Sequence, residues 1–222
     1  MNMSNERVVW NTRQKELKAI IVKPEHHESA IEGILAQHAA VHSAQIAGSD
    51  VWSFEDEVLD DMSEENYRRV PKPGVNSIAW HIYHSTRIED ITLNTLVADR
   101  PQIFDELDWS GRMGIRYRDT GNGMNDDELR ELSASVHIPS LRDYRNAVGL
   151  RTREIVMALA PGELKQKIDH SRVALIKSNK DVREEGEWLL DYWGGLTKAG
   201  IILMPATRHL LVHLNKAQRL KK

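Results

Sequence analysis

The spacing of apolar residues constrains this chain more than any other feature of its sequence. Apolar side chains recur three and four positions apart along four long segments, and Gly and Pro residues fall between these segments. This spacing places apolar side chains on one side of a helix, whereas a half-buried strand alternates apolar and polar residues. The segments span about 25–46, 76–98, 138–160 and 201–220. The chain is therefore predicted to be all-α.

Each of the four segments has an apolar stripe that needs a partner, and a four-helix bundle satisfies all four most simply. With 41% hydrophobic residues in 222, the chain holds enough apolar material for one sizeable core. Two connections are too long for a minimal bundle, and we expect a short helix in each, at 126–132 and at 188–194. Such insertions commonly cover one end of a bundle or form a contact surface.

The N-terminal residues carry their own apolar positions, among them Trp10 and Leu17, and are predicted to form an additional docked helix. We therefore expect an N-terminal helical extension over 1–24 and a bundle domain over 25–222. The second long segment has two candidate N-terminal caps, Asn76 and Ser77. In the last segment, Pro205 lies either in the first turn or at a kink.

Composition excludes several classes of function. The 30 Lys and Arg residues against 33 Asp and Glu residues give a net charge of -3, so a nucleic-acid partner is not expected. No apolar run is long enough to span a membrane and the N-terminus has no signal-peptide pattern, so a cytoplasmic location is expected. The chain has no Cys, which leaves His, carboxylates and water as metal ligands. Its 10 His residues are therefore candidate metal ligands.

Helical projection predicts which histidines face inward. On the second segment His84 lies on one apolar stripe with Trp80 and Ile88, and His81 lies between this stripe and another. On the last segment His209 and His213 are one turn apart. The first segment repeats this spacing with His38 and His42, which lie within its apolar stripe.

Imidazoles four positions apart on a helix have Cβ atoms about 5–6 Å apart, so both can reach one metal ion at about 2.0–2.1 Å. A third imidazole from a facing helix leaves positions open for water or substrate, as in catalytic zinc sites. A chain with ten histidines often contains this spacing by chance, however. A buried neutral histidine bonded to a carbonyl is the alternative interpretation.

Three charged residues near these histidines in the sequence are not expected to bind the metal. Arg208 projects away from the face of His209 and is expected in a surface or interface ion pair. Glu89 and Asp90 are candidates for orienting an imidazole, but their positions off the His84 stripe favour solvent or a neighbouring helix.

Two stretches of sequence carry a resemblance to a known family. They are NSIAWHIYHSTRIED at 76–90 and PATRHLLVHLN at 205–215. In motif, order and length the chain resembles the DinB/YfiT-like superfamily of metalloproteins over roughly residues 25–218. The resemblance implies an up-down-down-up four-helix bundle, with one His of the second helix and a His pair of the fourth binding a divalent metal.

Carried over to this sequence, the implied ligands are His84, His209 and His213. The implied ion is nickel or zinc, with manganese or iron as alternatives. Four further residues are expected to line the pocket: His42, Trp80, His38 and His81. His42 is also a candidate additional ligand, and His81 is a weaker candidate than His84 for the ligand of the second helix. No catalytic residue is identified.

The resemblance also implies a function. Some members of the superfamily transfer a low-molecular-weight thiol, and members often form homodimers. The leading hypothesis is a metal-dependent transferase or hydrolase that uses such a thiol, or water, on a small-molecule substrate and forms a homodimer. The alternative is a non-catalytic bundle that binds a metal or ligand as a sensor, or serves as a dimerisation module.

Overall fold

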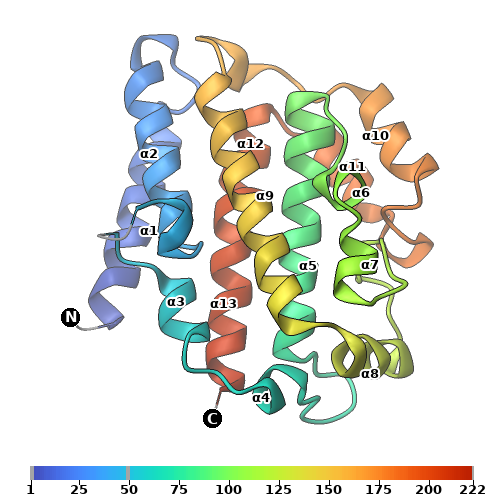
Figure 1. Ribbon diagram of the computed structural model, residues 1–222. Coiled ribbons are helices and arrows are strands. Elements are labelled where there is room, and N and C mark those ends of the chain that lie inside the picture. Colours follow the sequence, from blue (N-terminus) through green and yellow to red (C-terminus); the bar gives the residue numbers. More distant parts are fainter. Residues whose placement is uncertain (1–2, 49–50, 222) are drawn as a thin grey trace.

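The computed structural model describes residues 3–48 and 51–221, which form helices and connecting loops (Figure 1). The extended pairing within these residues is one isolated antiparallel bridge, between Lys167 and Thr197. The all-α prediction is therefore confirmed. Within the described ranges, no helix is both long enough and apolar enough to cross a membrane.

Four long helical segments lie side by side and form the bundle (Figure 1). They are α2 (His27–Ala39), α5 (Ile78–Asp90) with a π-helical continuation (Ile91–Ala98), α9 (Ile138–Ala158), and α12 (Lys198–Leu203) joined to α13 (His209–Leu220) by a π-helical turn (Met204–Arg208). Pro205 lies in that π-helical turn, where its missing N–H removes a helical hydrogen bond.

Helix α5 is the central helix of the molecule. It packs against α13, α9, α4 (Glu64–Arg68) and α8 (Asp126–Ser135), and all of its residues are buried. Its first turn is capped by Ser77, one of the two predicted caps, whose hydroxyl accepts a hydrogen bond from the Trp80 amide at 3.0 Å. A helix buried on all sides places its polar side chains in the core, where each needs a partner.

The predicted N-terminal helix is present as α1 (Met3–Ile20), which packs against α2. Trp10 and Leu17 are buried in this contact. The Trp10 indole donates to the Gln37 carbonyl at 3.1 Å, and the Gln37 amide returns a bond to the Trp10 carbonyl at 2.9 Å. The division of the chain into an extension and a bundle domain stays a prediction.

The prediction of one helix over 25–46 is wrong, because α2 ends at Ala39. The carbonyls that a longer helix would use accept hydrogen bonds from other segments. These bonds join the Phe54 amide to Ala40 O (2.9 Å), Arg145 Nη2 to Val41 O (2.8 Å) and Ser53 Oγ to His42 O (2.7 Å). His42 therefore lies in the bend after α2 and not on the helix with His38.

The long connections form short helices that cover the bundle. They are α3 (Phe54–Leu59) and α4 before α5; α6 (Ile103–Glu106), α7 (Trp109–Met113) and α8 before α9; and α10 (His170–Ser178) and α11 (Trp188–Gly194) before α12. The short helices expected at 126–132 and 188–194 correspond to α8 and α11. Asn125 and Glu128 form a capping box at the start of α8.

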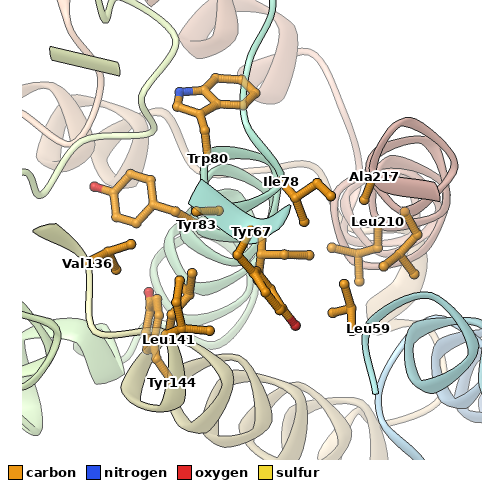
Figure 2. Close-up of a cluster of buried hydrophobic side chains, with 14 of the residues drawn as sticks. Leu59, Tyr67, Ile78, Trp80, Tyr83, Val136, Leu141, Tyr144, Leu210 and Ala217 are labelled. Carbon is orange, nitrogen blue, oxygen red and sulfur yellow. The ribbon is translucent and has the colours of Figure 1, made fainter. Parts of the chain in front are cut away.

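The apolar core near the start of α5 gathers side chains from several of these elements. Figure 2 shows Tyr67 and Tyr83 around the axis of α5, with Leu141 of α9 on one side and Leu210 of α13 on the other. Each of these four side chains is at most 2% exposed, and each of the two leucines contributes roughly 1.5–3 kcal/mol of burial free energy. This packing fixes the position of α5 relative to α9 and α13.

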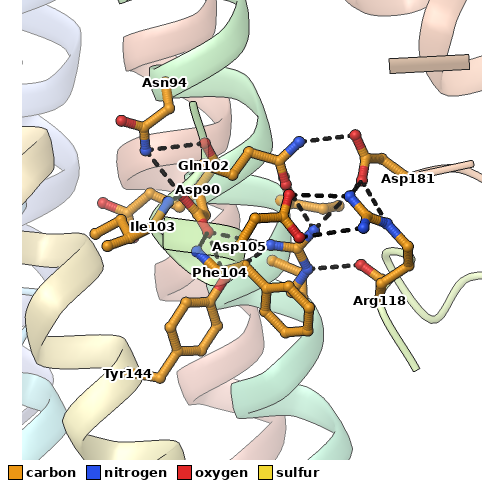
Figure 3. Close-up of polar contacts among 12 residues, drawn as sticks. Asp90, Asn94, Gln102, Ile103, Phe104, Asp105, Arg118, Tyr144 and Asp181 are labelled. Carbon is orange, nitrogen blue, oxygen red and sulfur yellow. Dashed lines mark hydrogen bonds and ion pairs between the residues drawn. The ribbon is translucent and has the colours of Figure 1, made fainter. Parts of the chain in front are cut away.

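A buried polar network holds the far end of α5 (Figure 3). The Asp90 carboxylate accepts bonds from the Ile103 amide at 3.1 Å, the Phe104 amide at 3.0 Å and the Tyr144 hydroxyl at 2.7 Å. Of the two surroundings expected for Asp90, solvent or a neighbouring helix, the structure has the second, because its side chain is fully buried and bonded to α9 through Tyr144. The network anchors the connection after α5.

Candidate metal centre

Four successive carbonyls in the loop between α7 and α8 accept hydrogen bonds from one side of α5. The pairs are Arg87 Nε with Arg118 O (2.8 Å), Tyr83 Oη with Asp119 O (2.7 Å), His84 Nδ1 with Thr120 O (2.6 Å) and Trp80 Nε1 with Gly121 O (3.2 Å). The loop is therefore fixed to α5 residue by residue. Gly121 has φ +79°, and a Cβ there would lie 3.0 Å from Trp80 Nε1, so the position favours glycine.

This loop determines which nitrogen of His84 carries the proton. A carbonyl accepts and cannot donate, so the His84 proton is on Nδ1, bonded to Thr120 O. The lone pair is then on Nε2. The Trp80 indole stacks on the His84 ring with centroids 4.4 Å apart and an interplanar angle of 7°, which limits rotation of the ring. Sequence reasoning placed Trp80 next to His84 but missed the role of Thr120.

The lone pair of His84 points at the histidines of α13. His84 Nε2 lies 3.2 Å from His209 Nε2, and the ring centroids of His84 and His213 are 4.6 Å apart. One ring nitrogen from each of the three histidines lies within 4.8 Å of those of the other two. The three residues singled out from the sequence are therefore brought together, by α5 from one side and α13 from the other.

His81 contacts the third of these histidines. The Nδ1 atoms of His81 and His213 are 2.9 Å apart, so one of them carries a proton that the other accepts. When His213 Nδ1 is the donor, the lone pair of His213 is on Nε2, as in His84. Histidine ligands in metal sites commonly have such a partner on the second ring nitrogen.

Burial keeps the four rings neutral near pH 7. It lowers the pKa of His84 to about 4 and that of His81 to about 3. Burial, reinforced by neighbouring imidazoles, also lowers the pKa of His209 and of His213 well below the ordinary range. Neutral imidazoles offer lone pairs, so the protons of these rings compete weakly with a metal ion.

The donor set fits a divalent metal ion. His84, His209 and His213 supply three imidazole nitrogens, and no carboxylate belongs to this group within the described residues. Three imidazoles suit zinc, nickel and other first-row divalent ions. Such a set leaves coordination positions for water or substrate, which distinguishes reactive sites from closed structural ones.

A cavity of about 180 Å³ lies beside His84 and His209. Its other lining residues are Ile88, Asn122, Trp188, Leu189, Tyr192, Trp193, Met204 and Pro205. Trp188 and Tyr192 of α11 are 60% and 41% exposed, so aromatic side chains form the solvent edge of this cavity. No Asp, Glu, Lys or Arg lines it. The larger surface hollows, such as one of about 350 Å³ next to Lys198, contain none of the three histidines.

The remaining histidines of the sequence analysis form a second cluster. His38 Nε2 lies 2.8 Å from one oxygen of Glu89, and His42 Nε2 lies 2.9 Å from the other. The two rings stack with centroids 4.2 Å apart. Of the two surroundings expected for Glu89, solvent or a neighbouring helix, the structure has the second, because Glu89 is fully buried and bonded to the end of α2.

Electrostatics in this second cluster favour an ionised carboxylate. Burial lowers the pKa of His42 to about 3. Burial disfavours the charged form of Glu89, but His42 and His38 outweigh it and hold the pKa of Glu89 below its usual value. Glu89 therefore carries a negative charge deep in the bundle.

Arg208 lies outside both clusters. Its side chain is exposed, bonds to Asn11 of α1 and lies over the Trp10 ring at 5.8 Å. It points away from the neighbouring His209, in agreement with the helical projection. Where an ion pair was expected, Arg208 donates a hydrogen bond to the side-chain amide oxygen of Asn11.

The model of the DinB superfamily matches residues 50–191 of the chain. The match includes α5 with His84 and Glu89, and it ends before α13, which carries His209 and His213. No curated protein matches the chain. Because the matched region is more than half of the sequence and contains the central helix of the bundle, the chain belongs to the DinB superfamily.

Proposed function

We propose that this protein is a divalent-metal-dependent enzyme in which His84, His209 and His213 hold the ion. One observation carries the proposal: three neutral imidazoles converge from α5 and α13 at the edge of a cavity. In a purely structural histidine cluster, each ring nitrogen is expected to end on a carbonyl or another protein donor. Here the Nδ1 of His209 is buried without a partner, and its Nε2 faces the Nε2 of His84.

The residues around the site would orient the ligands and restrict water. Thr120 O keeps the proton of His84 on Nδ1, and His81 provides a partner for His213. Trp80 covers one face of the His84 ring. When bound, a divalent ion held by neutral ligands keeps its full charge and supplies Lewis acidity, which lowers the pKa of a water or thiol ligand.

The cavity supports a small, uncharged substrate. Its lining is apolar and aromatic except for the two histidines, Asn122 and the Tyr192 hydroxyl. A charged group there would lose its hydration without gaining an ion pair. The chain has no Cys, so a reacting thiol has to come from outside the protein. We therefore propose a low-molecular-weight thiol, or water, as nucleophile toward a small apolar electrophile.

Metal content and turnover test this proposal together. Protein purified without chelators is expected to carry close to one ion of nickel or zinc per chain at this site, and His209→Ala is expected to lose it. Arg208→Ala is the matched control, because Arg208 is adjacent in sequence and points away from the site. Conjugation of 2-mercaptoethanol to chlorodinitrobenzene by the loaded protein gives a readout of thiol transfer.

Two results would contradict the proposal. The ligand assignment would be refuted if neither variant lost its metal, or if both variants lost it. Specific metal loss in His209→Ala, without hydrolysis or thiol transfer by the loaded wild-type protein toward a panel of apolar electrophiles, would refute the enzymatic role and favour a metal sensor. The proposed homodimer and cytoplasmic location stay predictions.

A further inference from the structure

The second cluster holds a fully buried carboxylate between two imidazoles. The two hydrogen-bonding partners of the Glu89 carboxylate are His38 and His42, and Glu89 is 0% exposed. The nearby guanidinium of Arg145 is bonded to Glu55 and to the Val41 carbonyl. A carboxylate buried in this way is costly unless a positive charge lies beside it.

The geometry of the cluster supplies a complete set of metal donors. Each oxygen of Glu89 faces one imidazole nitrogen, at 2.8 Å for His38 and 2.9 Å for His42. One donor atom from each of the three residues lies within 4.8 Å of those of the other two. Two Nε2 atoms and two carboxylate oxygens make four donors, the number found in closed structural zinc sites.

The surroundings of His42 hold its ring in place. Its Nε2 faces Glu89, and its Nδ1 lies 4.0 Å from Glu55 Oε2, beyond hydrogen-bond distance. The ring also occupies space that Gly149 of α9 leaves free, because a Cβ at that position would lie 2.7 Å from His42 Nδ1.

We propose that His38, His42 and Glu89 bind a second divalent cation, of the zinc type, which links the end of α2 to α5. This cation would compensate the charge of Glu89 and would have a structural role, because the three side chains are at most 1% exposed. The site is separate from that of His84, His209 and His213 and does not depend on the enzymatic role proposed above.

The competing interpretation is a cluster held by hydrogen bonds alone, without a metal ion. In such a cluster the Nε2–H groups of His38 and His42 both donate to Glu89, and their Nδ1 atoms remain as buried acceptors without a hydrogen-bond partner. The two accounts differ in the number of metal ions that the protein binds. They also differ in whether the Nε2 atoms of His38 and His42 carry protons when zinc is present.

Zinc counting by mass spectrometry tests the proposal. Chelator-stripped full-length protein, reloaded with Zn²⁺ and desalted, is expected to hold two ions per chain. The double variant His209→Ala/His213→Ala is expected to hold one, and addition of Glu89→Gln to hold none. Gly149→Ala, which changes no ligand, is expected to weaken zinc binding at the second site by about 10-fold or more, as second-sphere changes do.

The outcomes separate this proposal from the proposed function. A double variant that holds no zinc would overturn the second site and leave the first intact. If the wild-type protein and the double variant each hold one ion, the second site is supported and the first is refuted. If Glu89→Gln does not fold, imidazole ¹⁵N spectra of the wild-type protein decide. Zinc-induced changes at Nε2 of His38 and His42 are expected, and unchanged protonated signals there would overturn the proposal.

Discussion

Two histidine clusters lie in the same bundle core, and their neighbours give them different properties. The open cluster, His84, His209 and His213, has three neutral imidazoles and borders a cavity. The closed cluster, His38, His42 and Glu89, has a carboxylate between two imidazoles and is fully buried. Histidine content and spacing are similar in both, so neither distinguishes a reactive site from a structural one.

The difference lies in what each ring nitrogen faces. In the open cluster the Thr120 carbonyl takes the proton of His84 and leaves a lone pair directed at the other rings. In the closed cluster Glu89 faces the Nε2 atoms of both rings. The donors of the open cluster therefore lie next to a space for substrate, whereas those of the closed cluster face one another in the core.

The largest expected effect is on acid stability, and it involves both clusters. In the folded metal-free protein the pKa is about 4 for His84 and about 3 for His81 and His42, against 6.5 in the unfolded chain. The unfolded chain therefore binds protons first as the pH falls. The free energy of unfolding should be constant above about pH 7 and decrease between pH 6.5 and 4, by about 1.4 kcal/mol per pH unit for each such histidine.

Urea unfolding at a series of pH values, with a chelator present, measures this slope. Replacing His84 of the open cluster or His42 of the closed cluster by Gln should reduce this slope by the contribution of one histidine. A free energy of unfolding that does not change between pH 6.5 and 4 would show that these rings take up protons equally in the folded and unfolded states, and that burial does not hold them neutral.

The next effect separates the clusters by stability. Glu89→Ala removes the hydrogen-bond acceptor of two buried imidazoles. Each unsatisfied imidazole costs about 1–3 kcal/mol, so we expect the free energy of unfolding of the metal-free protein to decrease by about 3 kcal/mol. His209→Ala removes a half-buried ring whose Nδ1 has no partner, and about 1 kcal/mol is expected. Denaturant unfolding of both variants compares them. Equal losses would mean that the two clusters do not differ in structural role.

A smaller effect tests how the open cluster is oriented. His81→Phe keeps an aromatic ring but removes the hydrogen bond to His213. Zinc affinity at the open cluster should decrease about 10- to 100-fold, as it does when a partner of a metal ligand is lost. Isothermal titration with the Glu89→Gln background isolates this site. An unchanged affinity would show that His213 needs no partner, and a complete loss would make His81 itself a ligand.

The smallest effect concerns the solvent edge of the cavity. Trp188 is 60% exposed and lines the cavity, and it is not one of the proposed metal ligands. Trp188→Ala should raise KM for an apolar substrate several-fold, because part of the apolar contact is lost, and should leave zinc content at both clusters unchanged. Steady-state kinetics with metal analysis measures both quantities. A change in zinc content with unchanged KM would contradict the assignment of this cavity to substrate.

Much of the fold was predictable because helical periodicity is a local property. The stripe of Trp80, His84 and Ile88 predicted an inward His84, and Ser77 was one of two expected caps. The end of α2 was not predictable in this way. The carbonyls after Ala39 are bound by Arg145 and by the segment around α3, and no local pattern reports such distant partners.

The site was predictable only in part for the same reason. The sequence spacing indicated His84, His209 and His213, but Glu89 was assigned to solvent or a neighbouring helix because it lies off the His84 stripe. That inference assumes a helix with one buried face, whereas α5 is buried on all sides. Thr120 was missed because it acts through its carbonyl, a group that every residue has. The glycine at 121 was the available signal, since it permits the close approach of the loop to Trp80.

Whether His84, His209 and His213 share one cation is tested most directly in a crystal of the full-length protein grown with zinc and measured at the zinc absorption edge. We expect an anomalous peak about 2.0–2.1 Å from one nitrogen of each of the three rings, with His84 Nδ1 still bonded to Thr120. Zinc bound elsewhere in the protein, with these three rings bonded to one another and no peak between them, would contradict it.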